Sequence, residues 1–307
     1  MAKKIETHIA DESSFIATDT LLKDKRTIVL NFNTQGNIGK TTETVGLIEV
    51  MKAMGSNPAL ISADPENKVM LNIYGTKDEY GALTDQKLGV GVVEIDMADK
   101  DGKLSDLLAD PALDGRDVVV DTMGGSFNAF ATLYSGLSDF YNAFPSDRFI
   151  CLLPVADMKS FENLHRQAQV YRDLDSGTEI IMAFIFSKGK IGSIDNFKQI
   201  SSAYNAFKSS LQLPTNIQTA ELVFDTAWST EEMNKFFKEN KVRESIKHAR
   251  GNTLILAQKF INERDKAWVD LLVSPDRKAE LALMPHPTDS RNGRLWGKTL
   301  IGATWTL

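Results

Sequence analysis

The chain has 307 residues, which is enough for one large α/β domain or two small ones with a fully buried core. Its formal net charge of −6 excludes a protein that covers nucleic acid with positive charge over its whole surface, but it leaves room for a local basic patch. The single cysteine, Cys151, lies in an apolar run and excludes both a disulfide framework and a thiolate metal site within one chain.

The chain lacks the usual signals for export and membrane insertion. Its first residues have no apolar core of the signal-peptide kind. No run approaches the about 18 apolar residues that cross a bilayer. A reducing compartment fits the single thiol, so we expect a cytoplasmic protein.

The first expected strand, residues 27–30, leads into a loop that ends in Gly39, Lys40 and Thr41, and a helical pattern follows over residues 43–54. A strand, a glycine loop and a helix form a phosphate cradle, because backbone N–H groups and the helix dipole face an anion there. In such a cradle the lysine reaches the β- and γ-phosphates and the hydroxyl binds Mg²⁺. We therefore expect Lys40 to bind phosphate and Thr41 to bind the metal ion.

The loop departs from the standard pattern G-x-x-x-x-G-K-[ST], whose first glycine would fall at Thr34. A chance Gly-Lys-Thr on a surface turn is the alternative interpretation, and the flanking strand and helix favour the phosphate loop. The residues expected to contact the nucleotide here are Gln35, Gly36, Asn37, Ile38, Gly39, Lys40, Thr41 and Thr42.

The later elements alternate between apolar strands and amphipathic helices. We expect strands at 58–62, 90–95, 117–121, 148–155 and 179–186, and helices at 101–108, 126–144, 161–174 and 194–211. Strands that are apolar on both faces and alternate with helices predict a three-layer α/β fold, a mostly parallel sheet with helices on both faces. Beyond residue 213 the pattern becomes helical, with a long helix expected over 244–272 and a break at Gly251.

This order gives three parts. Residues 1–26 form an N-terminal extension, residues 27–275 form a P-loop domain with a helical C-terminal part, and residues 276–307 form a tail whose structure the sequence does not decide. There is no internal repeat and no low-complexity linker.

Two acids end strands of the expected sheet. Asp121 closes an apolar strand and precedes Gly124 and Gly125, and Asp64 closes the second strand. Ligands of parallel sheets lie at the carboxyl ends of the strands, where both acids and the loop fall. In a P-loop protein such acids hold Mg²⁺ and orient the attacking water, so we assign Asp121 to the metal and Asp64 to the water. A surface acid and a simple Asp-Pro turn are the alternatives.

These motifs, in this order and spacing, resemble the ParA/MinD family of deviant Walker-A ATPases over roughly residues 27–225. The family's K-G-G-x-G-K-[ST]-[ST] corresponds to QGNIGKTT at 35–42, and its D-x-D-P-Q-x-N element to SADPEN at 62–67. Leu153-Pro154-Val155 resembles the later family strand that ends in proline. The resemblance implies catalytic roles for Lys40, Asp64 and Asp121, with Thr42 near the α-phosphate and a base pocket near Lys188 and Pro214.

The same resemblance implies a bacterial or plasmid-encoded, ATP- and Mg²⁺-dependent homodimer that holds its nucleotides at the dimer interface. Such proteins position cargo, often through an adaptor protein. The family's signature lysine is Gln35 here, and a neutral amide does not neutralise developing phosphate charge, so slow hydrolysis is expected. Some relatives that lack this lysine use a lysine elsewhere, and Lys159 is our candidate; a solvated lysine at a helix start is the alternative.

Basic residues gather near the C-terminus. Residues 229–266 hold nine Lys or Arg against six Asp or Glu. Either this is a solvated helix face, or it contacts DNA phosphates without sequence preference. The candidates for DNA contact are Lys235, Lys238, Lys241, Arg243, Lys247 and Arg250.

The tail mixes bulky apolar and basic residues over 291–305, as do the membrane-seeking helices that end MinD-like proteins. Gly293, Gly297 and Gly302 weaken any helix there, so we do not expect membrane binding.

Two functions remain open at this point. The first is an ATPase that positions or maintains plasmid or other DNA cargo, which the acids favour. The second is a nucleotide-dependent switch with little hydrolysis that assists DNA transfer or acts at a membrane, which Gln35 favours. A metabolic ligase on the same fold would need a small-molecule motif, and we find none.

Overall fold

The computed structural model describes residues 25–273 apart from 34, 37, 55, 65, 67, 97–102, 114, 135–136 and 226–249. Most of the N-terminal extension, the tail, and the loop residues Thr34 and Asn37 therefore lie outside the described part. The same holds for most of the residues expected to contact DNA, namely Lys235, Lys238, Lys241, Arg243 and Lys247.

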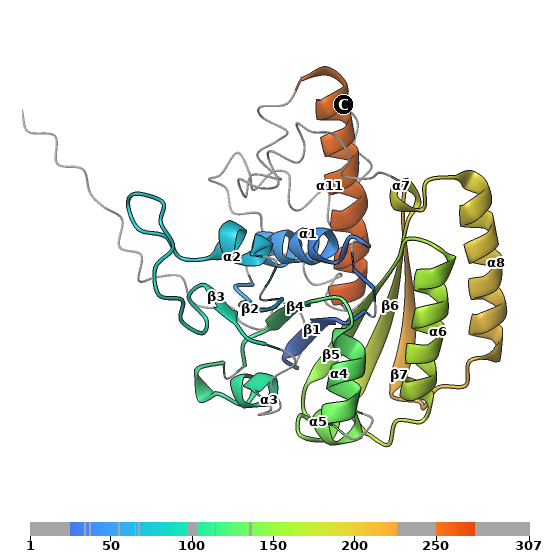
Figure 1. The fold of residues 1–307 in the computed structure, drawn as a ribbon, viewed down its shortest axis with the longest axis horizontal. Coiled ribbons are helices and arrows are strands. Elements are labelled where there is room, and N and C mark those ends of the chain that lie inside the picture. The colour runs from blue at the N-terminus through green and yellow to red at the C-terminus, as the bar shows by residue number, and fades with distance from the viewer. Residues whose placement is uncertain are drawn as a thin grey trace, which may run out of the picture.

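Seven strands form one sheet in the order β3-β2-β4-β1-β5-β6-β7, and every pair of neighbours is parallel. Because the strands are parallel, all their carboxyl ends meet at one edge of the sheet (Figure 1). The strands are β1 (Thr27–Asn31), β2 (Ala59–Ala63), β3 (Val92–Glu94), β4 (Val118–Thr122), β5 (Arg148–Val155), β6 (Glu179–Ser187) and β7 (Ile217–Phe224).

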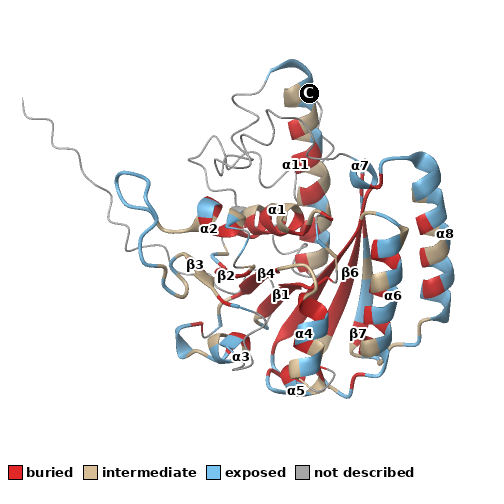
Figure 2. Cartoon of the chain, in the orientation of Figure 1, coloured by how far each residue is buried: buried red, intermediate tan, exposed pale blue. Residues whose placement is uncertain are grey.

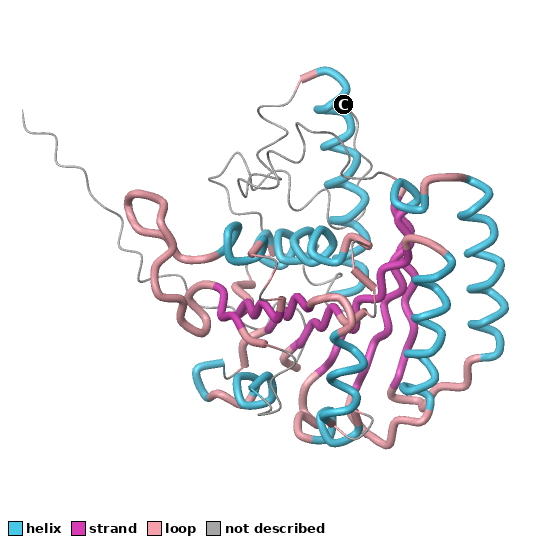
Figure 3. Tube along the Cα trace, in the orientation of Figure 1, coloured by secondary structure: helices cyan, strands magenta, loops and turns pink. Residues whose placement is uncertain are grey.

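Helices cover both faces of this sheet, as Figures 1 and 3 show. One face packs against α1 (Lys40–Ala53), α2 (Val69–Tyr74) and α11 (Gly251–Leu272). The other face packs against α3 (Lys103–Leu108), α4 (Ser126–Leu133), α5 (Ser138–Asn142), α6 (Met158–Arg172) and α8 (Ile194–Ser210). The expected three-layer α/β fold with a helical C-terminal part is confirmed.

The central strands are apolar on both sides because each side meets a helical layer. In β1, Ile28 and Leu30 belong to one core and Val29 to the other. Figure 2 shows the resulting buried strands between helices that are buried on one side only. Of the helices in the described ranges, none is both long and apolar enough to cross a membrane.

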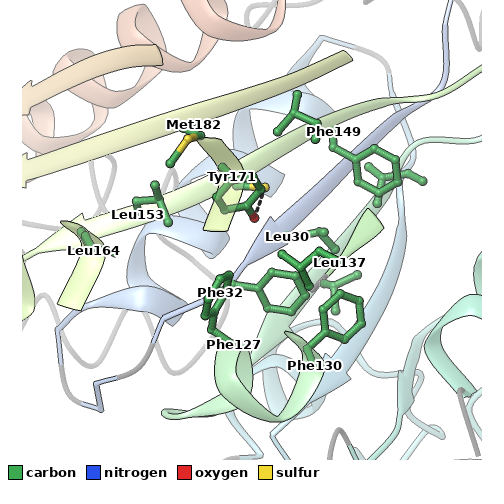
Figure 4. Close-up of a cluster of buried hydrophobic side chains, with 14 of the residues drawn as sticks. Leu30, Phe32, Phe127, Phe130, Leu137, Phe149, Leu153, Leu164, Tyr171 and Met182 are labelled. Atoms are coloured by element: carbon green, nitrogen blue, oxygen red, sulfur yellow. Dashed lines mark hydrogen bonds between the residues drawn. The ribbon is translucent and has the colours of Figure 1, made fainter. Parts of the chain in front are cut away.

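Aromatic side chains fill the core under α4 and α5 (Figure 4). Phe32 and Phe130 lie 4.6 Å apart between ring centroids, and the Tyr171 hydroxyl donates to Cys151 Sγ at 3.2 Å. Burial raises the pKa of the Cys151 thiol. The cysteine is a buried core residue, as its apolar neighbours in the sequence indicate.

The structure corrects the single helix expected over 126–144. The chain forms α4 and α5 instead, and the break contains Leu137, whose φ of 79° is unusual for a residue with a side chain. Leu137 is fully buried in the aromatic core. The apolar residues that suggested one long helix therefore belong to two short helices that approach the same core.

A second correction concerns β7, since the sequence beyond residue 213 was expected to be helical. This strand lies at the end of the sheet, and Gln218, Thr219 and Glu221 are exposed along it. An edge strand needs no continuous apolar run, so the pattern that identified the other strands was missing. The long helix begins at Gly251, and Arg250 before it is exposed and extended.

A buried ion pair fixes α11 to the first turn of α1. Arg264 donates to both Glu43 carboxylate oxygens, at 3.1 and 2.8 Å, and both side chains are buried. The guanidinium of Arg264 lies 4.3 Å from the Phe224 ring centroid and 3.5 Å from that of Phe260. This bidentate pair between aromatic rings ties the C-terminal helix to the helix that follows the phosphate loop.

We expect Arg264→Ala to lower the free energy of unfolding by about 3 to 5 kcal/mol, because Glu43 would remain buried without its cation. Urea unfolding measures the loss. The double variant Glu43→Leu/Arg264→Met is the control, and it should recover most of the stability because no charge is left unpaired. A loss below about 1 kcal/mol in the single variant would contradict this role.

Candidate nucleotide-binding site

The loop that the sequence identified as a phosphate cradle lies at the carboxyl edge of the sheet, between β1 and α1. Helix α1 begins at Lys40, three residues before its expected start. Gly39 immediately before it has a φ of 93°, which glycine adopts without the strain that a side chain would cause. The first turn of α1, which includes Lys40 and Thr41, has backbone N–H groups that lack a partner within the helix. Such N–H groups are what an anion site requires.

Lys40 is buried within this loop. The residue is 7% exposed, and Nζ donates to the Gln35 backbone oxygen at 2.8 Å. Burial lowers the pKa of Lys40, while the nearby carboxylates of Asp121 and Asp64 act in the opposite direction. The ammonium is thus partly desolvated and close to two acids, in a place where phosphate oxygens would be strong partners.

Asp121, at the end of β4, accepts hydrogen bonds from three side chains at this edge. Its side chain is 2% exposed, and Oδ2 accepts from Thr41 Oγ1 at 2.8 Å. Its Oδ1 accepts from Thr44 Oγ1 at 3.1 Å and from Asn31 Nδ2 at 3.4 Å. Burial raises the pKa of Asp121 to about 6, against the effects of these hydroxyls and of Lys40. The two residues assigned to Mg²⁺, Thr41 and Asp121, are therefore in direct contact.

Sequence reasoning missed Thr44 and Asn31, the other two partners of Asp121. Thr44 lies three residues after Thr41, so both hydroxyls project from one face of α1. Asn31 is paired with Asp121 in the register of β1 and β4. The helical spacing of the two threonines was the available signal.

Gly124 and Gly125 bring the turn after β4 against the phosphate loop. A methyl group on Gly124 would lie 2.9 Å from the Gly36 backbone nitrogen, closer than packed atoms allow. The Gly125 N–H donates to the Asn33 oxygen at 3.0 Å, and Asn33 Oδ1 accepts from the Gln35 N–H at 2.9 Å. Contact between the loop and the turn thus requires glycine at 124.

Gln35 is half-buried, and its contacts involve the start of α6. Its Nε2 lies 3.4 Å from Asp157 Oδ2, while its Oε1 is buried and has no partner among the described residues. Asp157 caps α6 and accepts from the Ser160 N–H at 2.6 Å. Lys159, the candidate for a substitute cation, is exposed on the first turn of the same helix.

The remaining loop residues and Asp64 also gather at this edge. Ile38 is buried and Thr42 is half-buried, and Gly36 is exposed. Asp64 follows β2, is half-buried, and interacts electrostatically with Lys40 and Asp121. The structure thus brings the three residues assigned to catalysis to one place.

The two residues expected near the base are separated by the sheet. Lys188 begins the short helix α7 (Lys188–Ile191) after β6, at the carboxyl edge, and pairs with Asp225 at 2.5 Å. Pro214 precedes β7 and therefore lies at the amino edge, opposite the loop. The position of Pro214 gives no support to its assignment, which rested on the family resemblance.

This arrangement suits an anion with a divalent cation. Among the described residues, no cluster of three or more His, Cys, Asp or Glu side chains forms a self-sufficient metal site. Mg²⁺ bound with phosphates needs only one or two protein ligands, because phosphate oxygens and water supply the rest. The Thr41 hydroxyl and the Asp121 carboxylate fit that requirement.

No protein-family model and no curated protein matches the sequence. Among solved structures, the chain is similar to McdA of Cyanothece, with 14% identity and a TM-score of 0.44, over 78% of this chain and 99% of that chain. It is similar to the MinD cell division protein of Aquifex aeolicus, with 14% identity and a TM-score of 0.45, over 77% and 95% of the two chains. A Cyanothece McdA variant in complex with ATP has 12% identity and a TM-score of 0.44, over 78% and 96%. At these values the likeness does not carry function over, so function is inferred from residues of this chain.

We expect Asp121→Asn to stabilise the protein at neutral and higher pH. The folded-state pKa of about 6 lies above the ordinary 3.8, so the folded state holds the proton more tightly and loses stability as pH rises between these values. The loss reaches about 3 kcal/mol once the carboxyl is ionised, and asparagine removes it while keeping an acceptor for Thr41.

Urea unfolding at pH 4 and pH 8 measures this effect. The stabilisation by Asp121→Asn should be present at pH 8 and absent near pH 4. Asp106→Asn, which neutralises an exposed acid on α3, is the control and should show no such pH dependence. An Asp121→Asn variant that is less stable than the parent at pH 8 would contradict the argument.

Proposed function

We propose that this protein binds ATP with Mg²⁺ at residues 35–42 and acts as a slow ATPase whose nucleotide state works as a switch. One observation carries the proposal: the Thr41 hydroxyl contacts the buried Asp121 carboxylate at 2.8 Å, beside the buried ammonium of Lys40. A lysine and a hydroxyl at the start of a helix, next to an acid at the end of a strand, are the groups that bind a nucleoside triphosphate with its metal ion.

The residues of the site have distinct roles in this proposal. Lys40 turns from the Gln35 oxygen to the phosphates and neutralises their charge. Thr41 and Asp121 hold Mg²⁺, which lowers the charge that develops on the phosphate oxygens. Asp64, which directly follows the adjacent strand β2, orients the attacking water.

We expect Lys40→Ala to weaken ATP binding at least about tenfold, because the loss of a charge-assisted contact costs more than about 1.4 kcal/mol. Isothermal titration with ATP and Mg²⁺ measures the affinity. Lys52→Ala, on the last turn of the same helix, is the control and should bind ATP as the parent does. Normal ATP affinity in the Lys40→Ala variant would overturn the proposed site.

A second function, a binding switch with little hydrolysis, is favoured by Gln35. Its neutral amide lies toward the Asp157 carboxylate and supplies no cation at the start of the loop. Without a cation at this place the charge of the transition state is less well stabilised, and turnover slows without loss of binding.

Replacement of Asp64 separates the two functions. If the protein hydrolyses ATP, Asp64→Ala should lower steady-state phosphate release by about a hundredfold or more while the affinity for ATP changes little. Asp96→Ala, which removes an exposed acid beyond the end of β3, is the control. Phosphate release that is equal in the parent and the Asp64→Ala variant would remove the catalytic assignment of Asp64. Release at the background rate in the parent would leave the binding switch.

The partners are proposed from the sequence resemblance. A homodimer that forms with ATP would double the molar mass measured in solution, and a strict monomer with bound ATP would exclude it. DNA cargo remains part of the proposal, and DNA-stimulated phosphate release is its test. Of the residues expected to contact DNA, Arg250 lies within the described part of the chain, where it is exposed just before α11.

A further inference from the structure

Lys190 approaches the phosphate loop from the side opposite the catalytic acids. A methyl group built on Gly39 would lie 3.8 Å from Lys190 Cε, which is ordinary van der Waals contact. Gly39 is the last loop residue before α1, and its neighbour is Lys40. The aliphatic part of Lys190 therefore lies against the loop, and its ammonium is one bond further along.

The position of Lys190 is set by the backbone of α7. This short helix follows β6 directly at the carboxyl edge, as Figure 1 shows, and Ile191 anchors it in the core. Lys188, on the same helix, is engaged by Asp225 at 2.5 Å and lies 5.0 Å above the Phe197 ring. Within the described part of the chain, no carboxylate pairs with Lys190.

The order of the strands separates Lys190 from the two acids of the proposed site. Asp121 and Asp64 follow β4 and β2, which lie on one side of β1, whereas Lys190 follows β6 on the other side. The metal ion and the reacting γ-phosphate belong to the side of the acids. The side of Gly39 and Lys190 is left for the inner phosphates of the same ligand.

We propose that Lys190 binds the α- and β-phosphates of nucleoside di- and triphosphates, as a positive charge supplied by the same chain. This inference rests on the proposed nucleotide site and adds a binding residue to it. Because both phosphates are present before and after hydrolysis, Lys190 contributes equally to binding of ATP and ADP. Its removal is therefore expected to weaken the affinity for both nucleotides.

The test is isothermal titration of ATP and of ADP, each with Mg²⁺, into the full-length protein and three variants. Lys190→Gln should weaken both nucleotides by a similar factor, on the order of tenfold. Lys190→Arg keeps the charge and should stay within about threefold of the parent. Lys208→Gln removes a lysine from the last turn of α8, at the amino edge, and should bind as the parent does.

Three results with the variants would overturn the inference. Unchanged affinities in Lys190→Gln would remove Lys190 from the site, and a loss for ATP alone would place it at the γ-phosphate. An equal loss in Lys208→Gln would show a general effect of net charge.

Lys40→Ala separates this inference from the proposed function. If Lys40→Ala loses binding while Lys190→Gln does not, only the inference fails; if the parent binds neither nucleotide, both fail.

Discussion

The buried carboxylate of Asp121 is the constraint on which the candidate site depends. It holds two hydroxyls of α1, those of Thr41 and Thr44, and so fixes the helix start against the end of β4. The parallel sheet makes this possible because the carboxyl ends of β1 and β4 are neighbours at one edge. Burying an ionisable acid opposes folding at neutral pH, so the protein keeps a charge there at a cost to its stability, as binding sites commonly do.

A second contact, with α11, also holds the first turn of α1. Glu43, between Thr41 and Thr44 in sequence, pairs with Arg264 of α11, so the first turn of α1 is attached both to the sheet and to the C-terminal helix. Gly46 faces α11, where a methyl group would make ordinary van der Waals contact with Trp268 Nε1 at 3.5 Å. In the proposed function, this attachment fixes the positions of Lys40 and Thr41 and so would limit the entropy lost when phosphate binds.

The sequence predicted the central strands because their burial on both faces leaves a continuous apolar run; the bounds of β5 agree with the expected residues 148–155. The prediction failed where contacts between residues far apart in the sequence determine the local structure. Leu137 is buried in the aromatic core at the break between α4 and α5. Strand β7 lies at the edge of the sheet and has no apolar run. The loop and both acids could be identified from local motifs. The ion pair between Glu43 and Arg264 joins residues 221 positions apart, and no local pattern indicates it.

The charges around the loop connect the proposed site to the proposed slow turnover. Acids follow the strands on one side of β1, and the lysine that touches the loop at Gly39 follows β6 on the other side. Gln35, at the start of the loop, offers an amide whose donor already lies toward Asp157. A cation near the inner phosphates strengthens the substrate and the product complexes alike, whereas faster hydrolysis requires stabilisation that appears only in the transition state. In the proposed function, a site with this distribution of charge would hold its nucleotide well and release phosphate slowly, as a switch requires.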